Sequence, residues 1–303
     1  MELLKIGANS LIIDSKFKFE KKEFWLDELL EFVKNYSKDY YEKYLSSHPN
    51  WNVLYNLSKL RQNIIFSCDI GKNDKVLELG SECGVITETL CQKANSVTCV
   101  ETSFTKSLVN AYRNNNNTNL KIFVTDYNNA KKYLQEKYNV IAIIGLKHNC
   151  LPIKNDDDFK HLLKALFDLL EAEGKIYIAF ENRLGLKYFA GCREDISGLF
   201  NEGLYGYENS PRKYGYAKEE IEKILSYLGA QKINFFYPYP NYQFCNSLYS
   251  DEYLPKIGEL SRNTFNLDMD RYVFFDERKV FDSLITTNYF KIFSNSFLVE
   301  IIK

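Results

Sequence analysis

A regular alternation of short apolar runs and helical segments, which begins near Gly71, limits the fold more than any other feature of this sequence. Strands are expected over Lys75–Leu79, Ser96–Glu101, Leu120–Thr125, Tyr138–Gly145, Gly174–Phe180, Lys232–Tyr237 and Ser296–Ile302. Helices are expected over Val85–Lys93, Thr105–Arg113, Asp158–Glu171 and Lys218–Leu228. This alternation predicts an α/β fold whose doubly wound parallel sheet carries helices on both faces. No helix precedes the last strand, so it is expected to pair antiparallel.

The segments outside this alternation predict the domain organisation. Residues 1–70 begin with a short apolar strand and continue with apolar residues at helical spacing, which predicts an N-terminal helical cap. Residues 71–303 form one domain with two insertions. The first, 182–216, is rich in glycine, and the second, 238–295, is rich in aromatic residues. Insertions of this length in a compact domain are usually lids or binding loops.

Composition excludes several classes of function. The 303 residues carry a net charge of −1, so the chain lacks the excess of cations that duplex nucleic acid requires. No run approaches 18 apolar residues, so no membrane span is predicted, and the N-terminus lacks a signal-peptide pattern. Seven scattered cysteines without a CxxC pair, together with three histidines, predict no metal site and a reduced, cytoplasmic protein.

The stretch Val76–Gly84 (VLELGSECG) carries the clearest functional signal, because it reads as a strand, a glycine turn and a helix start. In an open parallel sheet, ligands bind beyond the carboxyl ends of the strands, and Gly80 and Gly84 let the backbone approach one closely. The next strand ends at Glu101, 21 residues after Gly80, where a carboxylate accepts hydrogen bonds from ribose hydroxyls. The third strand is followed by Asp126 and Tyr127, which suit an adenine amino group and ring.

Charge indicates which nucleoside this turn binds. Dinucleotide folds place a G-x-G-x-x-G turn against a pyrophosphate, whereas here Glu82 stands inside the turn and would repel it. The same carboxylate, like that of Glu78, attracts the sulfonium and ammonium of S-adenosylmethionine. A nicotinamide-dependent oxidoreductase is therefore the weaker alternative.

These motifs resemble a class I S-adenosylmethionine-dependent methyltransferase. VLELGSECGVIT is similar to the first motif of that superfamily and VTCVE to its second, while SFLVEII is similar to its antiparallel seventh strand. IAFENRLGLKYFAGCRED, FYPYPNYQF, LYSDEYLP, RYVFFDERKVFD and FSNSFLVEI resemble a bacterial subfamily associated with glycosyltransferases of surface-polysaccharide biosynthesis. The resemblance implies a Rossmann-like, seven-stranded sheet with S-adenosylmethionine as cofactor. The cofactor-binding residues would be Glu78, Gly80, Glu82, Gly84, Glu101, Asp126, Tyr127 and Gly145.

The candidate catalytic residues follow the fourth and fifth strands. A hydroxyl acceptor needs a general base, and His148 follows strand four, although a surface-loop histidine is equally consistent with that position. Glu181, which ends strand five, is either an acceptor-binding base or a strand cap. Asp195 lies in the glycine-rich insertion, which is expected to form a lid, and Ile196 stands where the subfamily commonly has a histidine.

The sequence therefore predicts methyl transfer to an oxygen of a sugar or surface-polysaccharide precursor, with a glycosyltransferase as a partner. The alternative is a catalytically degenerate member that keeps the fold as a binding or regulatory protein. It is motivated by Glu82, which stands where the superfamily usually has a third glycine, and by Ile196.

Overall fold

A computed structural model describes residues 1–17, 24–48, 50–151, 153–261 and 269–303. The chain divides into two compact units. The first comprises Met1–Ile143, His148–Pro152 and Leu169–Gly174, and the second comprises Ile144–Lys147, Ile153–Asp168 and Lys175–Lys303. None of the helices in the described ranges is long and apolar enough to cross a bilayer.

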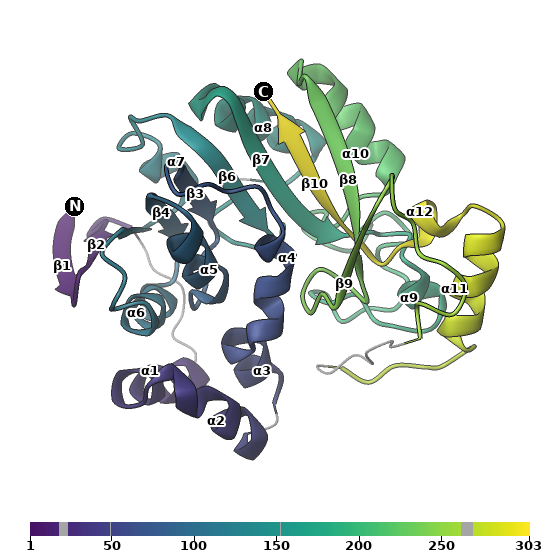
Figure 1. Cartoon of the computed structure of the whole chain (residues 1–303), viewed down its shortest axis with the longest axis horizontal. Helices are drawn as coiled ribbons and strands as arrows, with labels where there is room; N and C mark the ends of the chain where they lie inside the picture. The colour runs from purple at the N-terminus through teal and green to yellow at the C-terminus, as the bar shows by residue number, and fades with distance from the viewer. Residues whose placement is uncertain (18–23, 49, 152, 262–268) are drawn as a thin grey trace. The chain divides into compact units, whose positions relative to one another are not determined.

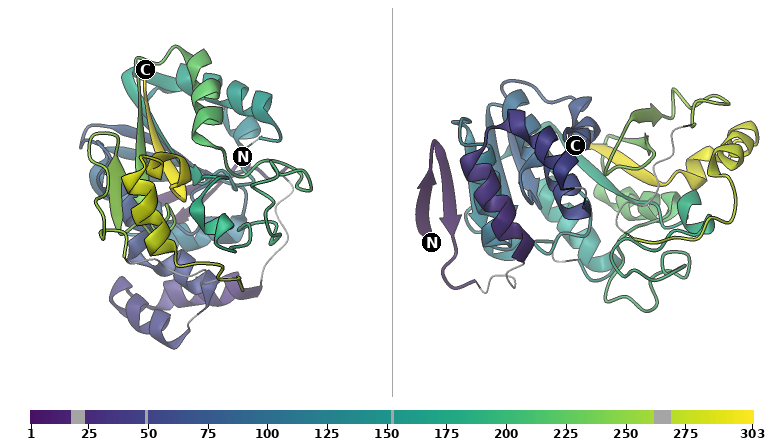
Figure 2. Two further views of the ribbon diagram at one scale, coloured as in Figure 1. Left: turned by 90° about the vertical axis from the view of Figure 1, so that its right-hand side faces the viewer. Right: turned by 90° about the horizontal axis from the view of Figure 1, so that it is seen from below.

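The first unit is built on parallel strands in the order β2-β5-β4-β3-β6, and β1 pairs antiparallel with β2 at one edge (Figures 1 and 2). The parallel strands are β2 (Asn9–Ile13), β3 (Lys75–Leu79), β4 (Ser96–Glu101), β5 (Leu120–Val124) and β6 (Tyr138–Ile144). The chain runs outward from β3 through β4 to β5 and then returns to β6 on the other side of β3. The strand order therefore reverses at β3, and ligands of open α/β sheets bind at such a reversal.

The N-terminal segment differs from the expected helical cap, because it opens with a hairpin. β1 (Glu2–Ile6) turns at Gly7, where φ is +56°, and β2 continues the parallel sheet beside β5. Helices follow, as predicted: α1 (Phe24–Asn35), η1 (Lys38–Tyr40), α2 (Tyr41–Ser47), α3 (Trp51–Leu57), η2 (Lys59–Gln62) and α4 (Asn63–Phe66).

Buried side chains of these N-terminal helices share a core with Cys83, from the glycine turn, and Val109. Val109 belongs to α6 (Phe104–Arg113), while α5 (Val85–Lys93) follows the turn directly. A short helix, α7 (Tyr127–Ala130), follows β5 and begins where the Asp126 carboxylate accepts the Asn129 backbone N–H at 2.8 Å. The helical segment thus packs on the turn that the sequence identifies as the ligand site.

The strands of the second unit pair antiparallel throughout, in the order β7-β10-β8-β9. Its strands are β7 (Leu170–Glu181, which begins in the first unit), β8 (Lys232–Tyr239), β9 (Ser247–Ser250) and β10 (Ser296–Ile302). β10 pairs antiparallel with both β7 and β8, which confirms the expected antiparallel last strand. The described residues therefore form ten strands rather than seven, because β1, β2 and β9 were not expected as members of the sheet.

Helices of the second unit are α8 (Asp156–Leu169), α9 (Leu186–Phe189), α10 (Lys218–Leu225), η3 (Ser226–Leu228), α11 (Glu277–Thr286) and α12 (Phe290–Phe293), the last two yellow in Figure 2. Several aromatic residues of the second insertion lie in the core, because Tyr239, Tyr249, Phe281 and Phe290 are buried. Phe290 meets Tyr237 of β8 edge-on at a ring separation of 5.7 Å. Edge-to-face packing of this kind stabilises an interior.

Candidate functional site

The turn between β3 and α5 is built by left-handed backbone. Gly80, Glu82 and Gly84 have φ values of +83°, +46° and +80°. A Cβ at Gly80 would overlap the ring of His148, and one at Gly84 would overlap the Asn110 side chain. Both glycines are therefore required by contact as well as by conformation. His148, predicted from its place after strand four, lies directly on the predicted cofactor turn.

Glu101, at the end of β4, orders this turn through its carboxylate. One oxygen accepts the backbone N–H of Glu82 at 2.9 Å, and the other accepts that of Ser103 at 2.9 Å. Burial raises the pKa of Glu101 above its ordinary value, while the charge of Lys106 and these hydrogen bonds oppose the shift. The structure thus places Glu101 beside the turn, at the strand end where the sequence predicted it.

Glu78 lies inside β3 and is buried among hydrogen-bond donors. Its carboxylate accepts from the Thr87 hydroxyl at 2.6 Å and from the Cys99 thiol at 3.2 Å. Burial raises the pKa of Glu78 to about 7, although both hydrogen bonds lower it. Glu78 therefore ties β3 to α5 and β4.

Glu82 faces two cationic or titratable partners in the first unit. Its carboxylate lies 3.4 Å from the Arg61 guanidinium and 3.7 Å from Nδ1 of His148. Arg61 belongs to η2 and is 3% exposed, and its guanidinium lies 3.5 Å from the centroid of the Tyr55 ring. Sequence analysis did not identify Arg61. Its only signal is a cation between apolar residues in a segment read as a structural cap.

The other predicted cofactor residues, Asp126, Tyr127 and Gly145, each make different contacts. Asp126 begins α7, as described above. Tyr127 is 3% exposed, and its backbone N–H donates to the Cys150 carbonyl at 3.0 Å. Gly145 belongs to the second unit, where its φ is +112° and its N–H donates to the Ala179 carbonyl at 2.8 Å.

The second unit brings the other two catalytic candidates together around one lysine. The Lys187 ammonium lies 2.9 Å from Glu181 and 3.3 Å from Asp195, and all three side chains are largely buried. Burial raises the pKa of Glu181 to about 8; the Asp195 charge adds to the shift and Lys187 opposes it. Burial alone would lower the pKa of Lys187, but the charges of Asp195 and Glu181 raise it. Sequence analysis named both acids but not this lysine.

Further polar groups surround this acid–lysine cluster. Glu194 accepts the backbone N–H of Ile196 at 2.9 Å and that of Ser197 at 2.6 Å, and the Gln243 amide donates to Asp195 at 3.4 Å. Among the described residues, nothing forms a hydrogen bond with the buried hydroxyls of Tyr188 and Tyr207. Burial raises the pKa of both tyrosines, and the charges of Glu181, Glu194 and Asp195 add to it.

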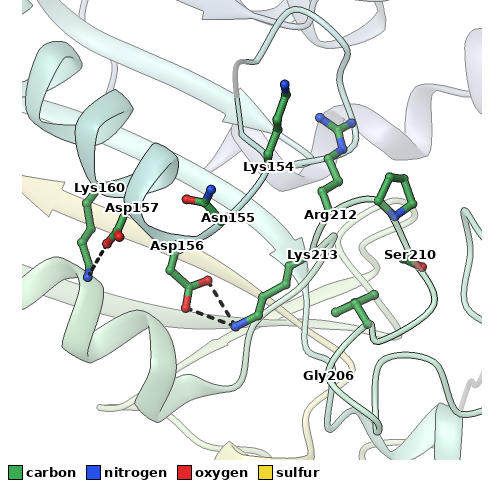
Figure 3. Close-up of a pocket in the computed structure, with 11 residues that line it drawn as sticks. Lys154, Asn155, Asp156, Asp157, Lys160, Gly206, Ser210, Arg212 and Lys213 are labelled. Atoms are coloured by element: carbon green, nitrogen blue, oxygen red, sulfur yellow. Dashed lines mark hydrogen bonds and ion pairs between the residues drawn. The ribbon is translucent and has the colours of Figure 1, made fainter.

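Tyr207 also lines a pocket of about 520 Å³ in the second unit (Figure 3). Its other lining residues come from the start of α8 and from the end of the glycine-rich insertion. Two of its cations are paired: Lys213 lies 3.1 Å from Asp156, and Lys160 lies 3.2 Å from Asp157 of the same helix. With Lys154 and Arg212 the lining carries four cations and two carboxylates, so the pocket is polar and has a net positive charge. No group of three or more potential metal ligands occurs in the ranges that the structure covers.

Comparison with known proteins identifies partial relatives. No family model matches the chain. A stretch of 105 residues, 34% of this chain, is 31% identical to ribosomal RNA small subunit methyltransferase A of Borreliella burgdorferi, and Borreliella afzelii has a relative of equal identity. The match covers 37% of each of these proteins, so the chain spans little more than a third of their length.

Several solved structures are distantly similar to the chain. A SAM-dependent methyltransferase from Archaeoglobus fulgidus has a TM-score of 0.46 and 16% identity, over 88% of this chain and all of that one. The N-methyltransferase NodS from Bradyrhizobium japonicum has a TM-score of 0.43 and 10% identity, over 81% of this chain and 92% of that one.

Proposed function

We propose that the protein is an S-adenosylmethionine-dependent methyltransferase that methylates a hydroxyl of a sugar or surface-polysaccharide precursor. The observation that carries the proposal is the left-handed glycine turn after β3, at the reversal of strand order, with the Glu101 carboxylate bonded to it. The partial relatives support it, because the proteins that match 105 residues at 31% identity are named methyltransferases.

The residues around the turn suit this cofactor chemically. Three buried carboxylates, those of Glu78, Glu82 and Glu101, favour a cationic ligand and disfavour a pyrophosphate. When bound, the cofactor supplies a methyl group on a sulfonium. In this proposal the cofactor is held by Glu78, Gly80, Glu82, Gly84, Glu101, Asp126, Tyr127 and Gly145.

In this proposal the methyl acceptor binds to the second unit. Its pocket of about 520 Å³ has the volume of a small-molecule site, and Tyr207 belongs both to the pocket lining and to the surroundings of the acid–lysine cluster. Carboxylates accept hydrogen bonds from sugar hydroxyls, and tyrosine hydroxyls can both donate to them and accept from them. We assign Glu181 and Asp195 as proton acceptors there, and we retain His148 as a third candidate.

The acceptor class follows from charge. Ribosomal RNA is a substrate class suggested by the names of the partial relatives, but a net charge of −1 provides little attraction for a polyanion. A sugar precursor agrees better with that balance. We also propose that the protein acts in the cytoplasm beside a glycosyltransferase; its seven cysteines are all free and buried.

One observation favours a second candidate function, a methyltransferase fold that binds without catalysing. The His148 ring stands against Gly80, and Glu82 of the same turn pairs with Arg61. If these side chains keep the turn closed to the cofactor, the protein would act as a binding or regulatory partner.

The test measures binding and transfer separately. Calorimetric titration with S-adenosylhomocysteine should give binding in the micromolar range. Incubation with labelled S-adenosylmethionine should then transfer label to sugar nucleotides or glycan extracts, but not to ribosomal RNA transcripts. Glu101→Gln should weaken binding about tenfold, because one charge-assisted hydrogen-bond acceptor is lost.

Glu136→Gln is the matched control, because Glu136 is a half-exposed acid of the same unit that pairs with the exposed Lys75. Label on RNA rather than glycan would overturn the acceptor assignment. Binding without any transfer would favour the non-catalytic candidate, and absence of binding would contradict the methyltransferase proposal itself.

A further inference from the structure

A buried arginine, Arg61, lies next to the proposed cofactor turn, and the proposed function assigns it no role. Arg61 donates to the Tyr55 hydroxyl at 2.8 Å and to the Tyr55 carbonyl at 3.2 Å, while its guanidinium stacks on the Tyr55 ring. These contacts hold the side chain in place. A buried guanidinium is always charged, so it requires a nearby anion.

The Glu82 carboxylate contacts Arg61 at the long end of the ion-pair range. The distance of 3.4 Å between the guanidinium and Glu82 exceeds the roughly 2.7–2.9 Å of a strong charge-assisted hydrogen bond. The Glu82 backbone is at the same time fixed by its left-handed φ and by its bond to Glu101. The two opposite charges are thus held near each other by separate supports and not mainly by their mutual contact.

The stability of the fold does not explain why Arg61 and Glu82 are buried side by side. Buried ion pairs often contribute no more than well-packed apolar residues, because desolvation offsets the attraction. A fixed cation beside a fixed anion is instead complementary to a zwitterion. The α-amino-acid end of S-adenosylmethionine is a zwitterion, whereas a pyrophosphate is not.

On the basis of the proposed function, we infer that Arg61 and Glu82 bind the amino-acid end of the cofactor: Arg61 takes its carboxylate and Glu82 its ammonium. Without ligand the two side chains neutralise each other. With ligand each side chain exchanges that partner for one of equal charge, so no buried charge is left uncompensated. The N-terminal helices would then contribute to the cofactor site directly, through η2.

Two ligands separate this inference from the proposed function. S-adenosylhomocysteine carries the amino-acid end, and 5′-methylthioadenosine has the same nucleoside and thioether without it. Affinities for both are measured by calorimetry on the full chain. Arg61→Gln and Glu82→Gln should each weaken S-adenosylhomocysteine binding about tenfold to a hundredfold. They should leave 5′-methylthioadenosine binding within about twofold, as should the control Lys75→Gln, which removes an exposed ion pair of the same unit.

The double variant Arg61→Glu with Glu82→Arg exchanges the two charges. It tests whether the Arg61–Glu82 pair has only a structural role. It restores an internal ion pair but reverses the order of the charges. The melting temperature should recover relative to the single variant Arg61→Glu, while S-adenosylhomocysteine binding should stay weak. Recovery of both would overturn the inference.

Equal losses for the two ligands in Arg61→Gln and Glu82→Gln would also overturn it, as would unchanged affinity for both. In these cases wild-type binding still supports the cofactor assignment. Failure of the wild-type protein to bind either ligand removes the proposed function and this inference together.

Discussion

The glycine turn of the first unit holds three buried carboxylates and the acid–lysine cluster of the second holds two largely buried ones, and the two regions stabilise them differently. Around the turn, Glu78 and Glu101 accept hydrogen bonds of 2.6–3.2 Å from hydroxyl, thiol and backbone groups. In the cluster, the Lys187 ammonium contacts both Glu181 and Asp195, and the Gln243 amide donates to Asp195 at a longer 3.4 Å.

This difference indicates which region tolerates a change of charge. Neutral donors hold a carboxylate in place without introducing a second buried charge, so removal of one donor leaves the others in place. The charge of Lys187 has no such substitute: among the described residues, the other side-chain donor to this pair is the Gln243 amide, 3.4 Å from Asp195. We therefore expect the cluster to be the more fragile region, and its stability to be the more sensitive to pH.

The largest expected effect is that of Lys187→Met. Within the part of the chain that the structure describes, Lys187 supplies the only ammonium within 4 Å of Glu181 and Asp195, and breaking a buried ion pair costs about 3–5 kcal/mol. The free energy of unfolding, measured at pH 8.5 by urea denaturation and circular dichroism, should fall by that amount. At pH 5 the loss should be smaller, because Glu181 is then protonated.

Lys75→Met is the control, because Lys75 and Glu136 form an ion pair with both side chains more than 40% exposed. It should cost less than about 1 kcal/mol. Equal losses in the two variants would mean that the buried cluster is no more fragile than an exposed pair.

The sequence predicts the elements next to the glycine turn well. β3, α5, β4 and β10 have the expected bounds, because apolar runs and glycine punctuation define them locally. β1 and β9 were missed. β1 pairs with β2 at one edge of the sheet and its first four residues are exposed, so it lacks the apolar pattern of a buried strand. β7 begins at Leu170, inside a segment that reads as the end of a helix.

The candidate site residues also divide into those that the sequence predicts and those that it misses. Glu78 lies within β3, Glu82 in the turn that follows it and Glu101 at the end of the neighbouring β4, so the strand pairing alone brings all three together. Arg61 and Lys187 were missed because each acts through a contact that spacing does not encode. Arg61 reaches Glu82 across 21 positions, and Lys187 is a single cation between the apolar residues of α9.

Gly80→Ala is expected to have the next largest effect. The left-handed φ costs a residue with a Cβ about 1–2 kcal/mol, and overlap with His148 adds about 1–3 kcal/mol. The first unit should therefore lose about 2–5 kcal/mol. Tryptophan fluorescence reports this unit, because Trp25 and Trp51 both belong to it.

Gly229→Ala separates conformation from contact, because Gly229 has a φ of +67° and nothing lies within 4 Å of its Cβ position. It should cost only the conformational part. Addition of His148→Ala to Gly80→Ala should recover the contact part. If it does not, His148 is not what makes a glycine necessary at position 80.

A further expected effect is a change in the slope of stability against pH. Glu181 has a pKa of about 8 in the folded protein, raised by burial above its ordinary value of 4.5. The folded state therefore holds a proton that the unfolded state has released. Stability from this group is complete below pH 4.5 and is lost as pH rises through about 8, with a slope of about 1.4 kcal/mol per pH unit.

Glu181→Gln should remove this contribution, so that urea unfolding between pH 5 and 8 shows a flatter profile than the wild type. Glu78 produces a slope of the same sign up to about pH 7, but in the first unit, so tryptophan fluorescence should keep its slope in Glu181→Gln. Asp195→Asn should narrow the window, because it removes a charge that raises the pKa of Glu181. If both variants keep the wild-type pH profile, Glu181 does not titrate with a raised pKa in the folded protein. The contrast between the two regions would then not hold.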